Sequence, residues 1–567
     1  MNRAEPNRVV RLLPSLTDAA FLLPLLFLFL RLPGGYHLLG DGDTGWHLRA
    51  GEWILQNGRV PEKDIFSFTK AGAPWFAWEW LWDVTFGWLH LHAGMAAVLV
   101  ACMLVLCCTY AILFRLVRRN CPNVLLAFAL TAFAAAGSSM HWLARPHLLT
   151  LLFVAVYCAI LQRVQEGRTR LLLWLPLLMM LWTNLHGGFF IGIFLIGCYG
   201  AGELTTWLVE QDRALAKAAL LRSRPYLATA AVCAVVTLAN PYFYHLHEHI
   251  WHYLRTPDLY RLIMEFQGTD FQSPQARYFE PLVVLGILAA AWSLYHKRFA
   301  DAFVVGVWVH LGLFSFRNIP IFLLVATPVV GRMLHAQLIR LEEAPLAAWV
   351  SRVTRGFGAF AAEFGATDRL PRVHLTSALA LLGVCGMFYL PAPPPNFRAE
   401  YDPKQFPAKA LKLFQNPKSA VHVFTSDLWG GYMIYRLFPQ TKVFIDGRSD
   451  MYGEAFSKKY SILINAQYGW EKTLASYGVD TVLLPVDAPL TGALKESQRW
   501  RPAYDDGFAI VFRSVEALSR ATAGEDATTS ASAGIAPAGG NKRGREITKP
   551  SPSDPRITKP NTRSESL

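Results

Sequence analysis

The stretch LLGDGDTGWHLRAGEWI, residues 38–54, follows directly after the first apolar segment of the chain. It holds two aspartates, a histidine, an arginine and a glutamate, which is an unusual charge load for a loop at the end of a membrane span. Asp41 and Asp43, two residues apart among glycines, can hold one divalent cation or divide the roles of ligand and general base. The same residues also suit an Asx-type turn. The polar residues of the other loops therefore decide between the two interpretations.

The composition indicates a membrane protein. Of 567 residues, 53% are hydrophobic and only 17% are charged. About 20 mainly apolar residues cross a bilayer as one helix. We therefore predict a polytopic α-helical membrane protein with about eleven transmembrane helices, near residues 12–32, 84–114, 124–140, 147–162, 171–185, 187–209, 225–240, 281–296, 299–316, 319–334 and 373–391. The eight cysteines lie almost entirely in these apolar runs without a CxxC pair, so we interpret them as small buried hydrophobes.

Basic residues gather in alternate loops. Arginines and lysines follow the spans that end near 114, 162, 209 and 296, and more fill the loop before the last span. Because such residues mark the cytosolic side, we expect the amino terminus in the cytosol, and residues 33–83 and everything after 391 outside it. Residues 341–368 are expected to form an interfacial amphipathic helix on the cytosolic side. The expected location is a bacterial inner membrane.

The external loops carry most of the unusual polar residues, although charge alone assigned their side. They include HWLARPH (141–147), NLHGG (184–188), a long loop at 240–280 and RNIP (317–320). Their convergence predicts one site where the spans emerge. The catalytic candidates are Asp41, Asp43, Glu79 and Glu265, the first two also as ligands of a divalent metal. The candidates for substrate binding are His47, Arg49, His141, Arg145, His147, Asn184, His186, Arg317 and Asn318.

Two of these arginines follow apolar spans with few charges nearby. A guanidinium placed like those of Arg145 and Arg317 is costly unless it is paired or faces a polar cavity. Its fork geometry suits phosphate oxygens. The alternative is an arginine that extends to the water interface. Asn184 and His186 leave a similar choice between binding a sugar hydroxyl and completing a helix end.

After residue 391 the pattern changes to that of a small α/β domain, residues 392–517. VHVF (421–424), KVFID (442–446), VDTVLL (479–484) and FAIVF (508–512) are expected as short strands with helices between them. Asp427, Asp446, Arg448 and Asp450 follow these strands and are either ligand-binding or plain loop residues. Residues 518–567 are rich in Ala, Ser, Thr, Gly and Pro, and we expect a disordered tail.

Residues 1–391 are expected as the membrane domain, and the layout of residues 12 to about 391, with GDGDTGWHLRAGEWI directly after the first span, resembles the GT-C glycosyltransferases. This superfamily includes oligosaccharyltransferases, protein O-mannosyltransferases and enzymes that glycosylate lipid A. The resemblance implies a polyprenyl-phosphate-linked sugar donor, with Asp41 or Asp43 as base or metal ligand and Arg145 or Arg317 on the lipid phosphate. The second external loop lacks the acidic pair of oligosaccharyltransferases, and their WWDYG-type motif is absent. Transfer to asparagine sequons is therefore not expected, and the acceptor is a glycan, a lipid or a protein.

The resulting hypothesis is an inverting membrane glycosyltransferase, with or without a divalent metal such as Mg²⁺ or Mn²⁺. Its partners are the bilayer, the lipid-linked donor and the acceptor, and no nucleic acid is expected. One alternative is a transporter or flippase for a polar solute or lipid-linked glycan, which would show internal repeats and polar residues at mid-membrane. Another is a non-catalytic membrane platform, in which Asp41 and Asp43 would be dispensable.

Overall fold

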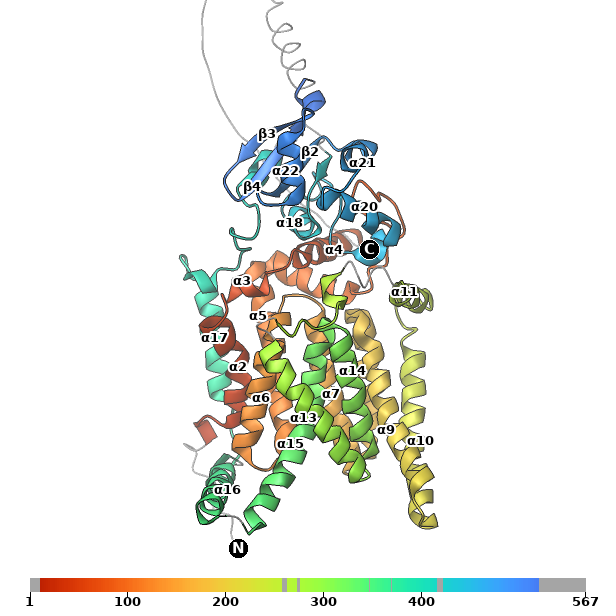
Figure 1. Ribbon diagram of the computed structural model, residues 1–567, viewed down its shortest axis with the longest axis vertical. Helices are drawn as coiled ribbons and strands as arrows, with labels where there is room; N and C mark the ends of the chain where they lie inside the picture. The colour runs from red at the N-terminus through yellow and green to blue at the C-terminus, as the bar shows by residue number, and fades with distance from the viewer. Residues whose placement is uncertain are drawn as a thin grey trace, which may run out of the picture. The chain divides into compact units, whose positions relative to one another are not determined.

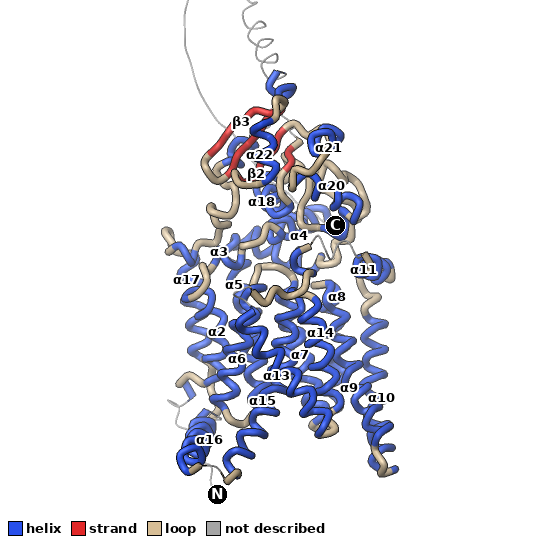
Figure 2. Tube along the Cα trace, viewed as in Figure 1, coloured by secondary structure: helices blue, strands red, loops and turns tan. Residues whose placement is uncertain are grey.

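The computed structural model describes residues 11–256, 263–272, 276–345, 347–368, 370–415 and 422–519. Helices run side by side in a bundle, and a small sheet lies at one end of it (Figures 1 and 2). The predicted disordered tail, residues 518–567, falls almost entirely outside the described residues.

The α-helices are α2 (Leu16–Leu30), α3 (Gly35–Leu38), α4 (Asp43–Asn57), α5 (Trp80–Asn120), α6 (Val124–Ser138), α7 (His147–Gln165), α8 (Trp174–Leu185), α9 (Phe190–Val209), α10 (Arg213–Val236), α11 (His245–Leu254), α13 (Ala276–Tyr295), α14 (Phe299–Phe314), α15 (Ile319–Glu343), α16 (Ala348–Asp368), α17 (Leu375–Phe388), α18 (Asp427–Leu437), α19 (Ser449–Tyr452), α20 (Glu454–Ile464), α21 (Trp470–Ser476) and α22 (Pro489–Glu496). The strands are β1 (Val423–Phe424), β2 (Thr481–Pro485), β3 (Trp500–Asp505) and β4 (Ala509–Ser514). Short 3₁₀ helices are η1 (Ser139–His141), η2 (Thr169–Leu173), η3 (Gly187–Phe189), η4 (Met264–Phe266), η5 (Phe316–Asn318), η6 (Pro395–Phe397) and η7 (Ala410–Phe414).

Seven helical segments among the described residues are long and apolar enough to cross a membrane, and we treat the chain as an integral membrane protein. They are Trp80–Asn120, Val124–His141, His147–Gln165, Gly187–Val209, Arg213–Val236, Ala276–Tyr295 and Phe316–Glu343. Four shorter apolar helices, at 16–30, 169–185, 299–314 and 375–388, coincide with other predicted spans. The total of eleven spans therefore stays a prediction.

The glycines of the opening stretch let α4 lie between two other helices at backbone distance. A Cβ on Gly42 would be 2.0 Å from the carbonyl oxygen of Leu428 in α18, and one on Gly51 would be 1.8 Å from that of Asp83 in α5. No larger side chain fits at either position without a shift of the backbone. The glycines in GDGDTGWHLRAGEWI thus fix α4 between the membrane bundle and the carboxy-terminal region.

The sheet has the order β1-β2-β4-β3, with β1 and β2 parallel and the other pairs antiparallel. The predicted strand KVFID is wrong as a strand, because only Val443 forms bridges, to Val423 and to Ser67. The pairing stays one residue long because the chain turns soon afterwards, where Gly447 meets α4. Strand β3 was not predicted: it is an edge strand with an irregularity after Pro502, and its side chains are mostly exposed.

The loop between α4 and α5 joins the carboxy-terminal region through a buried ion cluster. Arg448 contacts both oxygens of Asp446 at 2.7 Å and Asp64 of this loop at 2.8 Å. All three side chains are almost fully buried, and the guanidinium also lies 4.5 Å from the ring centre of Trp75. Gly447 is therefore held between two anchored residues, at the point where it approaches Asp43.

Candidate functional site

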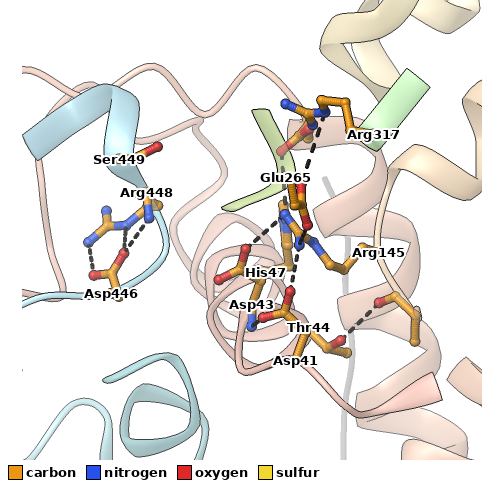
Figure 3. A network of polar contacts seen from close by, with 12 residues as sticks. Asp41, Asp43, Thr44, His47, Arg145, Glu265, Arg317, Asp446, Arg448 and Ser449 are labelled. Carbon is orange, nitrogen blue, oxygen red and sulfur yellow. Dashed lines mark hydrogen bonds and ion pairs between the residues drawn. The ribbon is translucent and has the colours of Figure 1, made fainter. Parts of the chain in front are cut away.

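Arg145 is the centre of a network of acidic side chains (Figure 3). Its Nη1 lies 2.5 Å from Asp41 Oδ2 and 3.3 Å from Glu265 Oε1, and its Nη2 lies 2.9 Å from Asp43 Oδ2. On the far side of Glu265, Arg317 Nε approaches Oε2 at 4.0 Å. Five sequence candidates from four separate segments are thus joined in one chain of ion pairs.

Backbone and side-chain hydrogen bonds hold the loop before α4 and the loop before α7 together at this network. The Asp43 amide donates to Asp41 Oδ1 at 3.0 Å, which forms the expected Asx-type turn at the start of α4. Thr44 Oγ1 donates to the carbonyl of Ala144 at 3.1 Å, and the Ala144 amide donates to Leu38 at 2.7 Å. The backbone next to Arg145 is therefore hydrogen-bonded to the loop that carries Asp41 and Asp43. The Asx-type turn and the ion pairs with Arg145 are present together.

Space beside Asp43 is limited by the carboxy-terminal region. A Cβ on Gly447 would lie 1.9 Å from Asp43 Oδ1, so only glycine fits there without displacing the carboxylate. The Asp43 residue is 7% exposed. No sequence pattern indicates this contact, because Gly447 is more than 400 positions away in the chain.

A second polar chain runs through His47 and Glu79. His47 Nδ1 is 2.6 Å from Asp83 Oδ1, and its Nε2 faces Glu79 Oε2 at 3.6 Å. The other oxygen of Glu79 lies 3.5 Å from His186 Nε2. Glu79 thus stands between two imidazoles.

Hydrogen bonding assigns the tautomer of one of these imidazoles. His186 Nδ1 accepts the Gly188 amide at 3.0 Å, so this nitrogen carries no proton and Nε2–H points at Glu79. Thr150 Oγ1, 2.7 Å from the same nitrogen, in turn accepts Trp182 Nε1–H at 2.9 Å. The loop NLHGG therefore presents a fixed N–H donor to the Glu79 carboxyl.

Burial and nearby charges separate the pKa values of Asp43, Glu79 and Glu265. Burial raises the pKa of Asp43 to about 8, and the charge of Asp41 adds to the rise against the opposing pull of Arg145. Burial likewise raises the pKa of Glu79 to about 8. Burial also acts to raise the pKa of Glu265, but Arg145 and Arg317 outweigh it and lower the value to about 2. The site therefore combines a permanently ionised glutamate with two carboxyls that change charge near neutral pH.

The two histidines of the site are uncharged. Burial lowers the pKa of His47 well below the usual range, and the charge of Arg145 lowers it further. Burial and then Arg317 do the same to His186. Both imidazole rings are therefore neutral and can accept or relay a proton. They provide no positive charge that would bind an anion.

Several other candidates are held in contacts away from the ion network. Arg49 donates to the Tyr435 carbonyl at 2.8 and 2.6 Å and contacts Glu52 at 2.5 Å, which attaches α4 to α18. Asn184 accepts Trp80 Nε1–H at 2.8 Å and donates to two carbonyls. Asn318 donates to the Leu311 carbonyl at 3.2 Å. In this arrangement their polar groups are occupied in holding the fold.

The histidines of HWLARPH line the loop beside Arg145. His147 Nε2 donates to the His141 carbonyl at 2.6 Å and so closes the turn. His141 Nε2 is buried and has no hydrogen-bond partner among the described residues. The Nε2 atom of His147 is therefore occupied, whereas that of His141 has no hydrogen-bond partner among the described residues.

The aspartate pair suits a guanidinium better than a metal ion. Asp41 and Asp43 each direct one oxygen at Arg145, which already supplies the positive charge between them. Among the described residues, no group of three or more His, Cys, Asp or Glu side chains could hold a metal ion. The two aspartates predicted to bind a metal therefore lack a third side-chain ligand among the described residues, and no step of the reaction is assigned to a metal.

Two participants were not among the sequence candidates. Asp83 fixes His47 through its 2.6 Å contact, and its other oxygen is buried without a hydrogen-bond partner among the described residues. Thr150 orients His186. Both residues lie in apolar helices, where they are easily taken for packing residues, although Glu79 and Asp83 at i and i+4 share a helix face.

No protein-family model matches the chain, and no curated protein matches it. Similar solved structures are those of the oligosaccharyltransferase of Archaeoglobus fulgidus. The apo form is 13% identical over 83% of this chain and 69% of that chain, with a TM-score of 0.49. The form tethered to an acceptor peptide with an NVT sequon is 12% identical over 88% and 73%, with a TM-score of 0.48. The complex with an inhibitory peptide and a dolichol-phosphate is 13% identical over 87% and 73%, with a TM-score of 0.49.

Proposed function

We propose that this chain is an integral membrane glycosyltransferase. It moves a sugar from a polyprenyl-phosphate donor to an extracytoplasmic acceptor, with inversion at the anomeric carbon. The observation that carries the proposal is the combination of Asp43, a buried carboxyl with a pKa of about 8, and Arg317, an arginine open to an anion, in one polar network.

The two arginines take different roles in this proposal. Arg145 is saturated by three carboxylates, so it orients the acids and neutralises their charge. Among the described residues, Arg317 has one distant ion-pair partner, Glu265 at 4.0 Å, and its side chain is 34% exposed. It also lies 4.8 Å from the ring centre of Phe266, which leaves the fork of the guanidinium available. Arg317 is therefore the better ligand for the donor phosphate.

The proposed reaction uses Asp43 as the base and Arg317 as the ligand of the donor phosphate. The acceptor's O–H or N–H gives its proton to the ionised Asp43 carboxylate while its oxygen or nitrogen attacks the anomeric carbon. The bond from that carbon to the phosphate oxygen breaks, and the polyprenyl phosphate leaves with one more negative charge. Arg317 stabilises the charge as it develops. Glu79, with a similar pKa and the His186 N–H beside it, is the second candidate for the base.

The position of the residues suits a lipid-linked donor. Arg145 directly precedes α7, His186 lies between α8 and η3, and Arg317 belongs to η5 before α15. All three therefore sit at ends of apolar helices, where a phosphate at the bilayer surface can reach them while its hydrocarbon tail stays in the membrane. The divalent metal that the sequence suggested at Asp41 and Asp43 is not part of this proposal, and chelation tests for it.

The experiment is sugar transfer by the purified full chain, from a panel of radiolabelled polyprenyl-phosphate sugars to envelope extract. Donor binding is measured in parallel, because it needs no acceptor. Arg317→Gln should weaken donor binding about tenfold or more, and Arg317→Lys should recover part of the loss. Arg277→Gln, at the start of the neighbouring α13, serves as the control for loss of one exposed positive charge. Donor binding equal in all four proteins would contradict the phosphate role, and no binding of any donor would contradict the proposed function.

A further inference from the structure

The end of the bundle opposite to the sheet holds a cavity of about 620 Å³. This lies within the range of about 300–1,000 Å³ found for small-molecule sites. The wall is formed by the start of α2, the ends of α5 and α7, and the segment after α16. Its charged residues are Arg115, Arg118, Arg119, Arg163, Arg372 and a single acid, Asp368.

The cavity wall already holds one anion. Asp368 Oδ1 accepts the amide of Leu16 at the start of α2 at 2.7 Å, and its Oδ2 contacts Arg118. Of the remaining arginines, Arg119 pairs with Glu166 at 3.2 Å and Arg372 donates to the Thr367 carbonyl at 3.2 Å. Arg115 donates to His374 at 3.1 Å, and the guanidinium of Arg163 makes no hydrogen bond or ion pair with the described residues. Several N–H groups are therefore available for a second anion.

Membrane proteins generally carry more basic residues on their cytosolic face, which explains the number of arginines on this side. This preference does not explain why five arginines line one cavity. Guanidinium groups repel one another when they converge, and this cost is offset when an anion binds between them. Arginine forks match the oxygens of a phosphate in particular. A phosphate group is thus the chemistry that fits the wall.

Helix α16 indicates where that phosphate comes from. Its exposed large apolar side chains are Trp349, Val353, Phe357, Phe360 and Phe364. At 100° per residue they cover an arc of roughly 80°, which is the stripe of a helix lying in a membrane interface. The helix lies at the same end of the bundle as the cavity (Figures 1 and 2). Its insertion would set the cavity at the level of the lipid headgroups.

We propose that this arginine-lined cavity binds the phosphate of an anionic phospholipid from the cytosolic leaflet. The site is separate from the acidic network and does not depend on the proposed transfer reaction. Lipid binding there would tie the ends of α2, α5, α7 and α16 together, because residues of all four segments line it or adjoin it.

The test is equilibrium binding of radiolabelled dioctanoyl phosphatidylglycerol to the full chain in a neutral detergent. Arg115→Gln combined with Arg163→Gln should lower the affinity about tenfold or more. The matched control is Arg213→Gln with Lys217→Gln, which removes two exposed positive charges from the start of α10 at the same end of the bundle. The control should stay within about twofold of the wild type. Arg163→Gln alone should also weaken binding, and it removes no side-chain hydrogen bond or ion pair with the described residues.

Two competitors separate the sources of phosphate. Dioctanoyl phosphatidylcholine and inorganic phosphate, at concentrations equal to the labelled lipid, should displace little of it. Equal losses in the cavity and control variants would show diffuse charge attraction and overturn the proposal. Displacement by phosphatidylcholine as effective as by phosphatidylglycerol would overturn the anionic preference, and equal displacement by inorganic phosphate would indicate a soluble anion instead of a lipid.

Discussion

Asp41→Asn should shift the pH dependence of sugar transfer toward lower pH. If Asp43 is the base, transfer requires its ionised form, so kcat/KM should rise as pH increases through about 8. Removing Asp41 removes a like charge, and it also leaves Arg145 with one fewer carboxylate to pair. Both effects favour the ionised Asp43, so its pKa falls and the rise in activity occurs at lower pH.

The geometry gives the size of this shift. Asp41 and Asp43 contact the two Nη atoms of one guanidinium, at 2.5 and 2.9 Å. Two charges about 5 Å apart at an effective dielectric constant of about 20 interact by about 3 kcal/mol, which corresponds to about two pKa units. Water around the Asp41 side chain, which is 19% exposed, weakens this interaction. We therefore expect a displacement of about one unit.

The assay is the initial rate of transfer at low donor concentration between pH 5.5 and 9.5. It compares wild type, Asp41→Asn and, as a control, Glu248→Gln, whose exposed side chain lies on α11. Glu79 has a similar pKa, which burial raises most and which the charge of Arg145 lowers. A profile that stays in place, or that moves to higher pH, would refute Asp43 as the base. An unmoved profile would point to Glu79.

Three further predictions concern the framework of the site and the metal. Arg448→Met leaves two buried carboxylates unpaired and should lower the stability by about 3–5 kcal/mol, seen as a lower temperature of thermal unfolding in detergent. Gly51→Ala forces a methyl group against the α5 backbone and should cost about 1–3 kcal/mol, whereas Gly197→Ala, with open space around it, should unfold at or above the wild-type temperature. Excess EDTA should leave the transfer rate unchanged, because Arg145 already supplies the charge between the aspartates; loss of activity that Mg²⁺ or Mn²⁺ restores would contradict this.

The segments that form the polar network could be predicted from the sequence, because membrane topology strongly limits which loops can meet. Once basic loops are assigned to one side, the loops with Asp41, Arg145, Glu265 and Arg317 must meet at the other. The structure joins these residues through ion pairs of 2.5–4.0 Å. Their catalytic and binding roles are still predictions.

The direction in which each side chain points could not be predicted from the sequence. Arg49 lies two residues after His47 on α4 and therefore points away from it, toward the Tyr435 carbonyl. The spacing of Glu79 and Asp83 indicates a shared helix face, but it does not show that Asp83 contacts His47. Thr150 lies in an apolar helix, where no local pattern distinguishes a residue that orients a histidine from one that packs. The approach of Gly447 to Asp43 depends on contacts between distant parts of the chain, such as the Arg448–Asp64 pair.

The central claim is that Asp43 accepts a proton during sugar transfer outside the cytosol. The most direct measurement is the transfer rate of Asp43→Asn beside wild type, with donor binding and thermal unfolding recorded on the same preparations. Loss of a positioned general base typically costs about 10²–10⁴-fold in rate. The account predicts a loss of that size with donor binding and unfolding temperature nearly unchanged. A rate within about tenfold of wild type would contradict the claim, since a general base contributes more than that.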